Sequence, residues 1–179
     1  MPLWTNLHQQ TATVYLTQTG QRRDAVETSI AIFGQTVAQE AQSEDDPHML
    51  ALIPAMGAWL SEALIQGAYM REYHTWEKDT KSYFNEQLKW NHLNNSKWTR
   101  KISHVSDVKD ALAQLSITVP NEAIEVIDQM RQKLNNIKHK ESWSDADFVN
   151  LNEYKAANTS IKIFWCALAE QEKYNPNLG

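Results

Sequence analysis

PNEAIEVIDQMRQKLNNIKHK, residues 120 to 140, is the stretch that decides the fold class. Pro120 has the φ angle of a first-turn helical residue, and Glu122 lies where the helix dipole favours a negative charge. Apolar residues then recur at spacings of three and four, which places them on one stripe of a helix. They are Ala123, Val126, Ile127, Met130, Leu134 and Ile137. The stretch therefore predicts an amphipathic helix whose apolar stripe enters a helical core.

A polar strip borders this stripe. At about 100° per residue, Arg131, Asn135 and Lys138 share one face, and His139 lies about 60° further round at the helix end. A strip in this position can line a cleft and bind phosphate. It can also be a basic last turn that complements the helix dipole and meets solvent, which is the commoner case for a run of charges. The pattern alone leaves both interpretations open.

Length and composition agree with a helical protein. The chain has 179 residues, enough for a sizeable core, and we expect a single domain over residues 1–179. Only five Gly and five Pro are present, which leaves little turn chemistry for an all-β fold. Residues 1–20 are the least clear, because LWTNLHQQ could begin a helix whereas TATVYLTQT is rich in β-formers. We assign them as helix.

Further helical segments flank the central stretch on both sides. We expect a helix from Arg22 to about Gln42. A second helical run follows Pro47; Pro54 breaks or bends it, and it then continues from Ala55 to Trp90. We further expect a loop over 91–103, a short helix to Leu115, and a last helix that starts at a capping box of Ser144 and Asp147. Together these predict an all-α fold: an antiparallel up-and-down helical bundle of about five to six helices with one long central helix.

The long helix carries two different faces. Tyr69, Tyr73, Trp76 and Tyr83 fall at helical spacings and form an aromatic stripe, which is typical of a core or a subunit interface. Since this stripe and the apolar last helix could exceed what one small bundle covers, we expect a homodimer. The roughly opposite face is basic and could close over the Arg131 strip or meet water. It carries Arg71, His74, Lys78 and Lys81, and we expect Arg71, His74 and Lys78 to contact phosphate if this face closes over the strip.

Several kinds of chemistry lack their sequence signals. The chain has no Gly-rich phosphate loop, no Cys/His zinc spacing, no GxSxG and no HExxH, so we expect neither a cofactor nor a metal. The one cysteine, Cys166, stands in the apolar run IKIFWCALA and reads as a buried thiol, which fits a reducing compartment. We find no leader-like start and no apolar run of about 18 residues, so we expect a cytoplasmic protein without membrane contact.

Charge is unevenly distributed along the chain. The net charge is −5, which gives no general reason to expect nucleic-acid binding. Between Lys97 and Lys140, however, eight Lys or Arg stand against five Asp or Glu, so this segment carries +3 and the remainder −8. A polyanion could therefore dock on this part of the chain alone.

The pairing of YMREYHTWEKDTKSYF with a later helix ending in DQMRQKLNNIKHK resembles uncharacterised members of the HEPN superfamily. The resemblance spans about Ala55 to Lys173. It implies a helical bundle, frequent homodimers and, in active members, metal-independent RNA cleavage, often in toxin–antitoxin or phage-defence systems. In this reading Arg131 takes the place of the motif arginine and His139 that of the motif histidine, with Asn135 or Asn136 as the polar residue between them.

The RNA hypothesis has a definite chemistry. His139 would be the titrating group, Arg131 would stabilise the charged phosphorane, and Lys138 would add a phosphate contact. Seven residues separate Arg131 from His139, whereas the family pattern has four to six. The alternative hypothesis is a catalytically inactive bundle that acts through protein–protein interaction, in a regulatory or antitoxin-like role, with a partner protein encoded nearby.

Overall fold

The structure is a computed structural model that describes residues 11–90, 105–114, 116–139 and 147–174. Within these ranges the chain forms helices and no strand, which confirms the predicted all-α class. The helices are α2 (Thr11–Ser43), α3 (Pro47–Trp90), α4 (Val105–Gln114), α5 (Asn121–His139) and α6 (Leu151–Tyr174).

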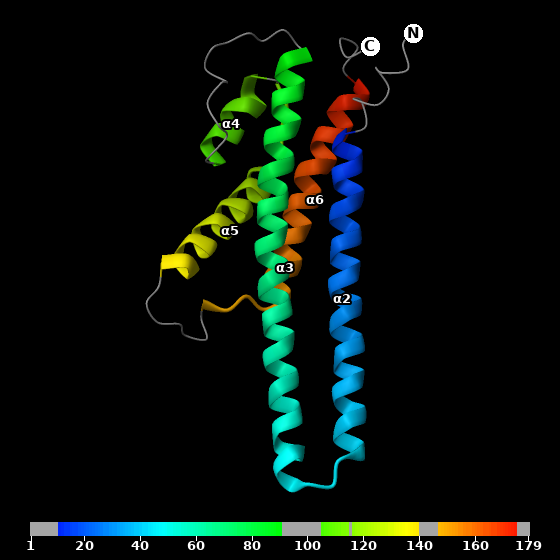
Figure 1. The fold of residues 1–179 in the computed structure, drawn as a ribbon. Coiled ribbons are helices and arrows are strands. Elements are labelled where there is room, and N and C mark those ends of the chain that lie inside the picture. Colours follow the sequence, from blue (N-terminus) through cyan, green and yellow to red (C-terminus); the bar gives the residue numbers. More distant parts are fainter. Residues whose placement is uncertain (1–10, 91–104, 115, 140–146, 175–179) are drawn as a thin grey trace.

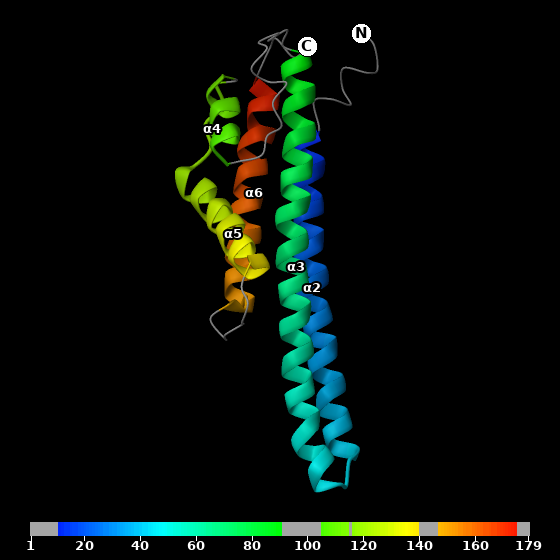
Figure 2. The ribbon, with the colours of Figure 1, turned by 60° about the vertical axis from the view of Figure 1, so that its left-hand side comes forward.

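The four longest helices, α2, α3, α5 and α6, alternate in direction along the chain, as the up-and-down prediction requires. In Figure 1, α2 descends, α3 ascends beside it, α5 descends and α6 ascends. Figure 2 shows that α4, α5 and α6 all lie on one side of the α2–α3 hairpin. Helix α2 packs against both α3 and α6, and α5 packs against α6. The long central helix is α3, with 44 residues.

The aromatic stripe of α3 is core. Tyr69, Tyr73, Trp76 and Tyr83 are each at most 7% exposed. Trp76 stacks edge-on with Phe164 of α6 at a ring-centroid distance of 5.5 Å. Because these rings are covered within one chain, the aromatic stripe cannot be the subunit interface from which the homodimer was expected.

Helix α5 buries almost the stripe that its sequence predicts. Ala123, Ile127, Met130, Leu134 and Ile137 are buried, as expected. Ile124 is buried as well, whereas Val126 is only half-buried. The apolar face is therefore wider toward the start of the helix, where α4 and α6 approach it.

Helix α6 begins later than predicted, at Leu151. The true cap is Asn150, whose side-chain Oδ1 accepts from the Glu153 backbone N–H at 2.9 Å while Glu153 Oε2 accepts from the Asn150 N–H at 2.9 Å. This reciprocal pair is a capping box. The predicted box of Ser144 and Asp147 is wrong as a helix start, because Asp147 precedes the helix, and Ser144 lies outside the described residues.

Two further expectations concern the hairpin. Residues 11–20 are helical, so the β-formers of TATVYLTQT are overridden by packing against α6. Pro54 lies inside a continuous α3 and does not break it. The predicted loop over 91–103 and the segment before Thr11 lie outside the described residues.

The hairpin extends well beyond the other helices (Figures 1 and 2). We call residues 28–64, which include its tip, the arm, and the packed remainder the body. Across residues 20–64 only Gly57 is buried, where an added Cβ would lie 2.9 Å from Val37 Cγ2. Helix α6 starts near the root of the arm, so no described helix covers the arm.

Two sequence expectations about apolar segments need correction. Cys166 is exposed on α6, because it faces away from the buried Phe164, Trp165 and Leu168. By length and composition alone, the helix Pro47–Phe84 could cross a membrane, although no run of this kind was expected. Only 11% of its most apolar 18-residue window is buried, so this window is not a core segment of the body.

Candidate functional site

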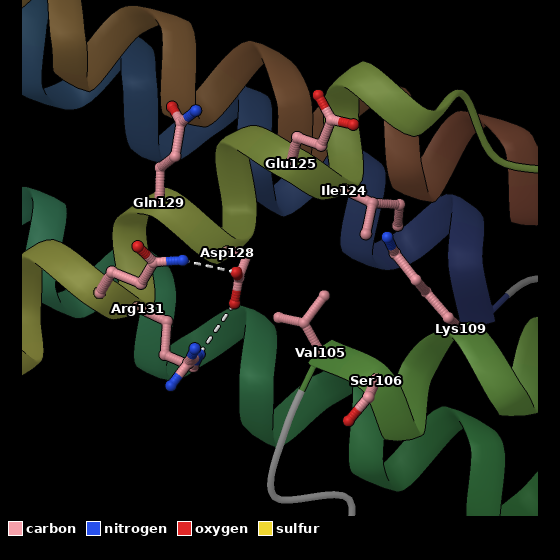
Figure 3. A pocket seen from close by; sticks show the side chains of 9 residues that line it. Val105, Ser106, Lys109, Ile124, Glu125, Asp128, Gln129 and Arg131 are labelled. Carbon is pink, nitrogen blue, oxygen red and sulfur yellow. Dashed lines mark hydrogen bonds and ion pairs between the residues drawn. The ribbon is translucent and has the colours of Figure 1, made fainter.

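Arg131 lies at a hollow of about 560 Å³ between α4 and α5 (Figure 3). Its Nε donates to Asp128 Oδ1 at 2.9 Å, and Gln132 Nε2 donates to Asp128 Oδ2 at 2.7 Å. Partial burial alone would raise the pKa of the Asp128 carboxyl, but these hydrogen bonds and the Arg131 charge outweigh it and lower that pKa. The guanidinium is thus already committed to a carboxylate.

The charges around this hollow balance. Lys109 and Arg131 are matched by Glu125 and Asp128 in its lining. A phosphate entering here would meet two carboxylates as well as two cations. The hollow is therefore a poor match for a polyanion.

His139, Lys138, Asn135 and Asn136 are all exposed toward the end of α5. None of them lines the hollow that holds Arg131. His139 is eight residue steps beyond Arg131 on the helix, which is about 12 Å along the axis. Within one described chain, the two predicted catalytic side chains share no pocket.

The predicted phosphate-binding residues of α3 lie elsewhere. Arg71 lines a groove between α2 and α3, His74 lies 3.7 Å from Glu77, and Lys78 is exposed. None of the three lines the Arg131 hollow. Tyr73, from the aromatic stripe, lies close enough to Arg131 and Asp128 for their charges to affect the pKa of its hydroxyl.

The groove that holds Arg71 has a volume of about 360 Å³ and a mainly apolar lining. It exists because small side chains face each other across the two helices, Ala25 and Ser29 on α2 with Ala63 and Gly67 on α3. A Cβ added at Gly67 would meet nothing within 4 Å. Arg71 has no ion-pair partner among the described residues. The groove is an apolar hollow with one uncompensated cation.

A buried ion pair forms the floor of this region. Arg22 Nε and a terminal nitrogen of its guanidinium each donate to one carboxylate oxygen of Glu72 at 2.9 Å, and Glu72 is only 1% exposed. The same guanidinium donates to Thr19 Oγ1 at 3.0 Å. Such a two-pronged Arg–carboxylate pair fixes the register of α2 against α3. No local sequence pattern signals this pair, because 50 residues separate its partners.

Tyr154 of α6 also lines the groove. Burial, and secondarily the nearby charge of Glu72, raises its pKa to about 12. Its hydroxyl has no hydrogen-bond partner within the described part of the chain. The phenol therefore stays protonated and neutral across the ordinary pH range.

In the described ranges, no group of three His, Cys, Asp or Glu side chains is placed to hold a metal ion. Comparison with protein-family models, with curated proteins and with solved structures found no match for this chain.

The arm is the most unusual of these surfaces. Its two stems, residues 28–39 and 47–61, contain no Lys, Arg, Asp or Glu, and four acidic residues stand together at the tip, Glu40, Glu44, Asp45 and Asp46. Of the twelve large hydrophobic side chains exposed in the described residues, eight lie on the arm. They are Ile32, Met49, Leu50, Leu52, Met56, Trp59, Leu60 and Leu64. The signal was present in the sequence as a charge-free stretch, but its exposure was not.

Proposed function

We propose that this protein acts through protein–protein association, with the arm as its binding element. The observation that carries the proposal is the exposure, outside the body, of a helical hairpin whose stems are apolar and uncharged. Eight large hydrophobic side chains are exposed on this one hairpin. Large exposed apolar patches on soluble proteins mark interaction sites. This favours the interaction hypothesis over catalysis by Arg131 and His139.

Lipid fits the arm less well than protein does. The uncharged α2 stem of residues 28–39 spans about 18 Å of helix, short of the hydrocarbon core of about 30 Å. Insertion of the hairpin would also carry the acidic tip across the bilayer, at about 2.5–3.5 kcal/mol for an Asp at its centre. A protein surface leaves the tip in water.

Photo-cross-linking in the native host tests the proposal. The full chain would carry p-benzoylphenylalanine in place of Met56, an exposed residue of the arm. We expect ultraviolet light to give a covalent adduct with a protein, visible as a discrete heavier band. The matched control places the same group at Ala51, which lies about 140° round α3 from Met56 and is also exposed.

The outcomes separate the alternatives. A protein adduct from position 56 that is stronger than that from position 51 supports the proposal. Adducts with phospholipid alone, or no adduct from either position, would overturn it. Equal adducts from both positions would show contact without a defined binding face, which also contradicts it.

RNA binding, with or without metal-independent cleavage, is the second candidate. What supports it is the exposed end of α5, where Lys138 and His139 have no ion-pair partner within the described ranges. If this surface binds RNA, Lys138→Ala should weaken binding and flatten its salt dependence, because a phosphate contact acts through counterion release.

Cleavage has a stricter test. His139→Ala and Arg131→Ala should each abolish hydrolysis of single-stranded RNA with the helical circular dichroism unchanged. Arg131→Ala also frees Asp128, so a loss of cleavage is informative only if the unfolding transition is retained. Wild-type protein that neither binds nor cleaves RNA at low salt removes this candidate and leaves the arm proposal untouched.

A further inference from the structure

The groove at the root of the arm continues as an apolar line toward the tip. Starting from Arg71 and Gly67 in the groove, steps of three and four residues along α3 stay on one face of the helix. The residues on this line are Met49, Ile53, Met56, Leu60, Leu64, Gly67 and Arg71. We call this line the seam.

The seam faces away from the body. Tyr69 and Tyr73 follow Gly67 and Arg71 by two residues, which is about 200° around the helix. These tyrosines point into the core with α5 and α6, so the seam lies on the opposite side of α3. Figure 2 shows that side of the hairpin uncovered by any described helix. Leu60 and Leu64 on it are 39% and 38% exposed.

We propose that the occupant of the seam is a second copy of this chain, packed antiparallel so that two arms form a four-helix bundle; this rests on the arm being a protein-binding element. The stems of the arm carry no charge, so a partner surface that fits them should also be uncharged. The stems of a second arm meet this requirement. Parallel packing would bring the two acidic tips together, eight carboxylates in one place. Antiparallel packing separates them by the length of the bundle.

One register satisfies charge and size together. If Asp46 lies opposite Arg71 of the partner subunit, the uncompensated cation of the groove faces the acidic tip. In the same register Met49 faces the partner's Gly67, so a large side chain meets the hollow left by small ones. Ile53 then faces the partner's Leu64, and Met56 the partner's Leu60. Each pair recurs by the two-fold symmetry.

The interface has the extent that a stable dimer needs. From Pro47 to Arg71 the seam is about 36 Å long, and two helices side by side are about 20 Å wide, so the face covers roughly 700 Å² in projection. Stable interfaces bury about 800 Å² per partner. Because α4–α6 lie on the far side of each hairpin, the two bodies sit on opposite outer faces without collision.

Sedimentation velocity on the purified full chain is the first test. We expect wild type to sediment as a dimer, and Met56→Asp to raise the dissociation constant at least a hundredfold by placing a carboxylate within the seam. Ala51→Asp adds the same charge to the exposed opposite face of the same helix and should leave the constant within a factor of about two. Circular dichroism should show both variants as helical as wild type.

Cysteine cross-linking tests the orientation. On a Cys166→Ser background, a chain carrying both Asp46→Cys and Arg71→Cys should form a disulfide-linked dimer under mild oxidation. The single variant Asp46→Cys should stay unlinked, since the two tips are far apart. A disulfide between two copies of the single variant would instead show parallel tips and would overturn the proposed packing.

Sedimentation and cross-linking together distinguish two claims: that a second copy occupies the seam, and that the arm binds protein at all. A chain that is monomeric at all accessible concentrations overturns the second copy as occupant. If position 56 nevertheless cross-links to a different protein in the host, the arm remains a binding element with another partner. Sedimentation of the purified chain with phosphatidylcholine vesicles, in place of dimerisation, would overturn both.

Discussion

The body and the arm are built from the same two helices but differ in what supports them. In the body, α3 is covered by α2 on one side and by α5 and α6 on another, and its aromatic side chains pack against Phe164 and Trp165. In the arm, α3 has only α2, and Gly57 is its one buried residue. A single sequence pattern, apolar residues at helical spacing, thus gives core in one half of the helix and exposed surface in the other.

This difference assigns stability of the fold to the body and the proposed binding to the arm. Burial of aromatic side chains and a satisfied ion pair stabilise the body without any partner. A two-helix hairpin has no such core of its own, so apolar side chains on its outer faces gain from burial only when another surface arrives. The arm is therefore expected to respond to binding, and the body to substitutions within the chain.

The largest expected effect is on the body. Glu72→Ala leaves Arg22 without its buried carboxylate, and breaking such a pair costs about 3 kcal/mol or more of unfolding free energy. Urea unfolding followed by circular dichroism measures it. Glu62→Ala, an exposed acid on the arm side of α3, is the matched control and should change stability by about 0.5 kcal/mol or less. Equal losses for the two variants would show that the ion pair does not hold the body together.

Alkaline pH should also act on the body alone. Burial raises the pKa of Tyr69, Tyr73 and Tyr154 to about 12, and the arm contains no tyrosine. These folded-state pKa values exceed the ordinary value of about 10, so folding favours the neutral phenols. Their contribution to the free energy of unfolding is therefore complete below about pH 10 and is lost as pH rises through about 12.

Absorbance at 295 nm and the helical circular dichroism, followed together, check this expectation. Part of the tyrosine signal should titrate late and in step with helix loss. If all six tyrosines ionise near pH 10 with the helices intact, the burial described for the body is contradicted.

The smallest effect sharpens the comparison within the arm. At Gly57 an added Cβ would approach Val37 Cγ2 at 2.9 Å, and a helical valine has little freedom to turn away. At Gly34 an added Cβ meets nothing within 4 Å. Gly34→Ala should stabilise the arm by up to about 1 kcal/mol through helix propensity, whereas Gly57→Ala should lose that gain to the clash.

Hydrogen exchange of the arm amides is the measurement for this pair, since it reports local opening. Slower exchange is expected for Gly34→Ala, and unchanged or faster exchange for Gly57→Ala. Equal protection in both variants would mean that α2 and α3 do not pack closely at the middle of the arm.

Local patterns along the chain determined the elements of this protein. The spacing of Ile127, Met130 and Leu134 defined the buried face of α5. For the aromatic stripe of α3 the spacing indicated a core or a subunit interface, and the structure shows that it is core. Helical faces can be derived this way because residues three and four apart are neighbours in any α-helix. The same rule placed Arg131 and His139 on one helix, but it could not say whether a cleft joins them.

Tertiary structure alone decided which faces are covered and which charges are paired. Arg22 and Glu72 meet only because α2 and α3 fold back on each other. Met56 and Trp76 belong to the same helix, yet one is 56% exposed and the other 2%, because α6 starts at Leu151 and runs beside only the upper part of α3. Coverage depends on the length and position of distant segments, and no spacing within one helix encodes it.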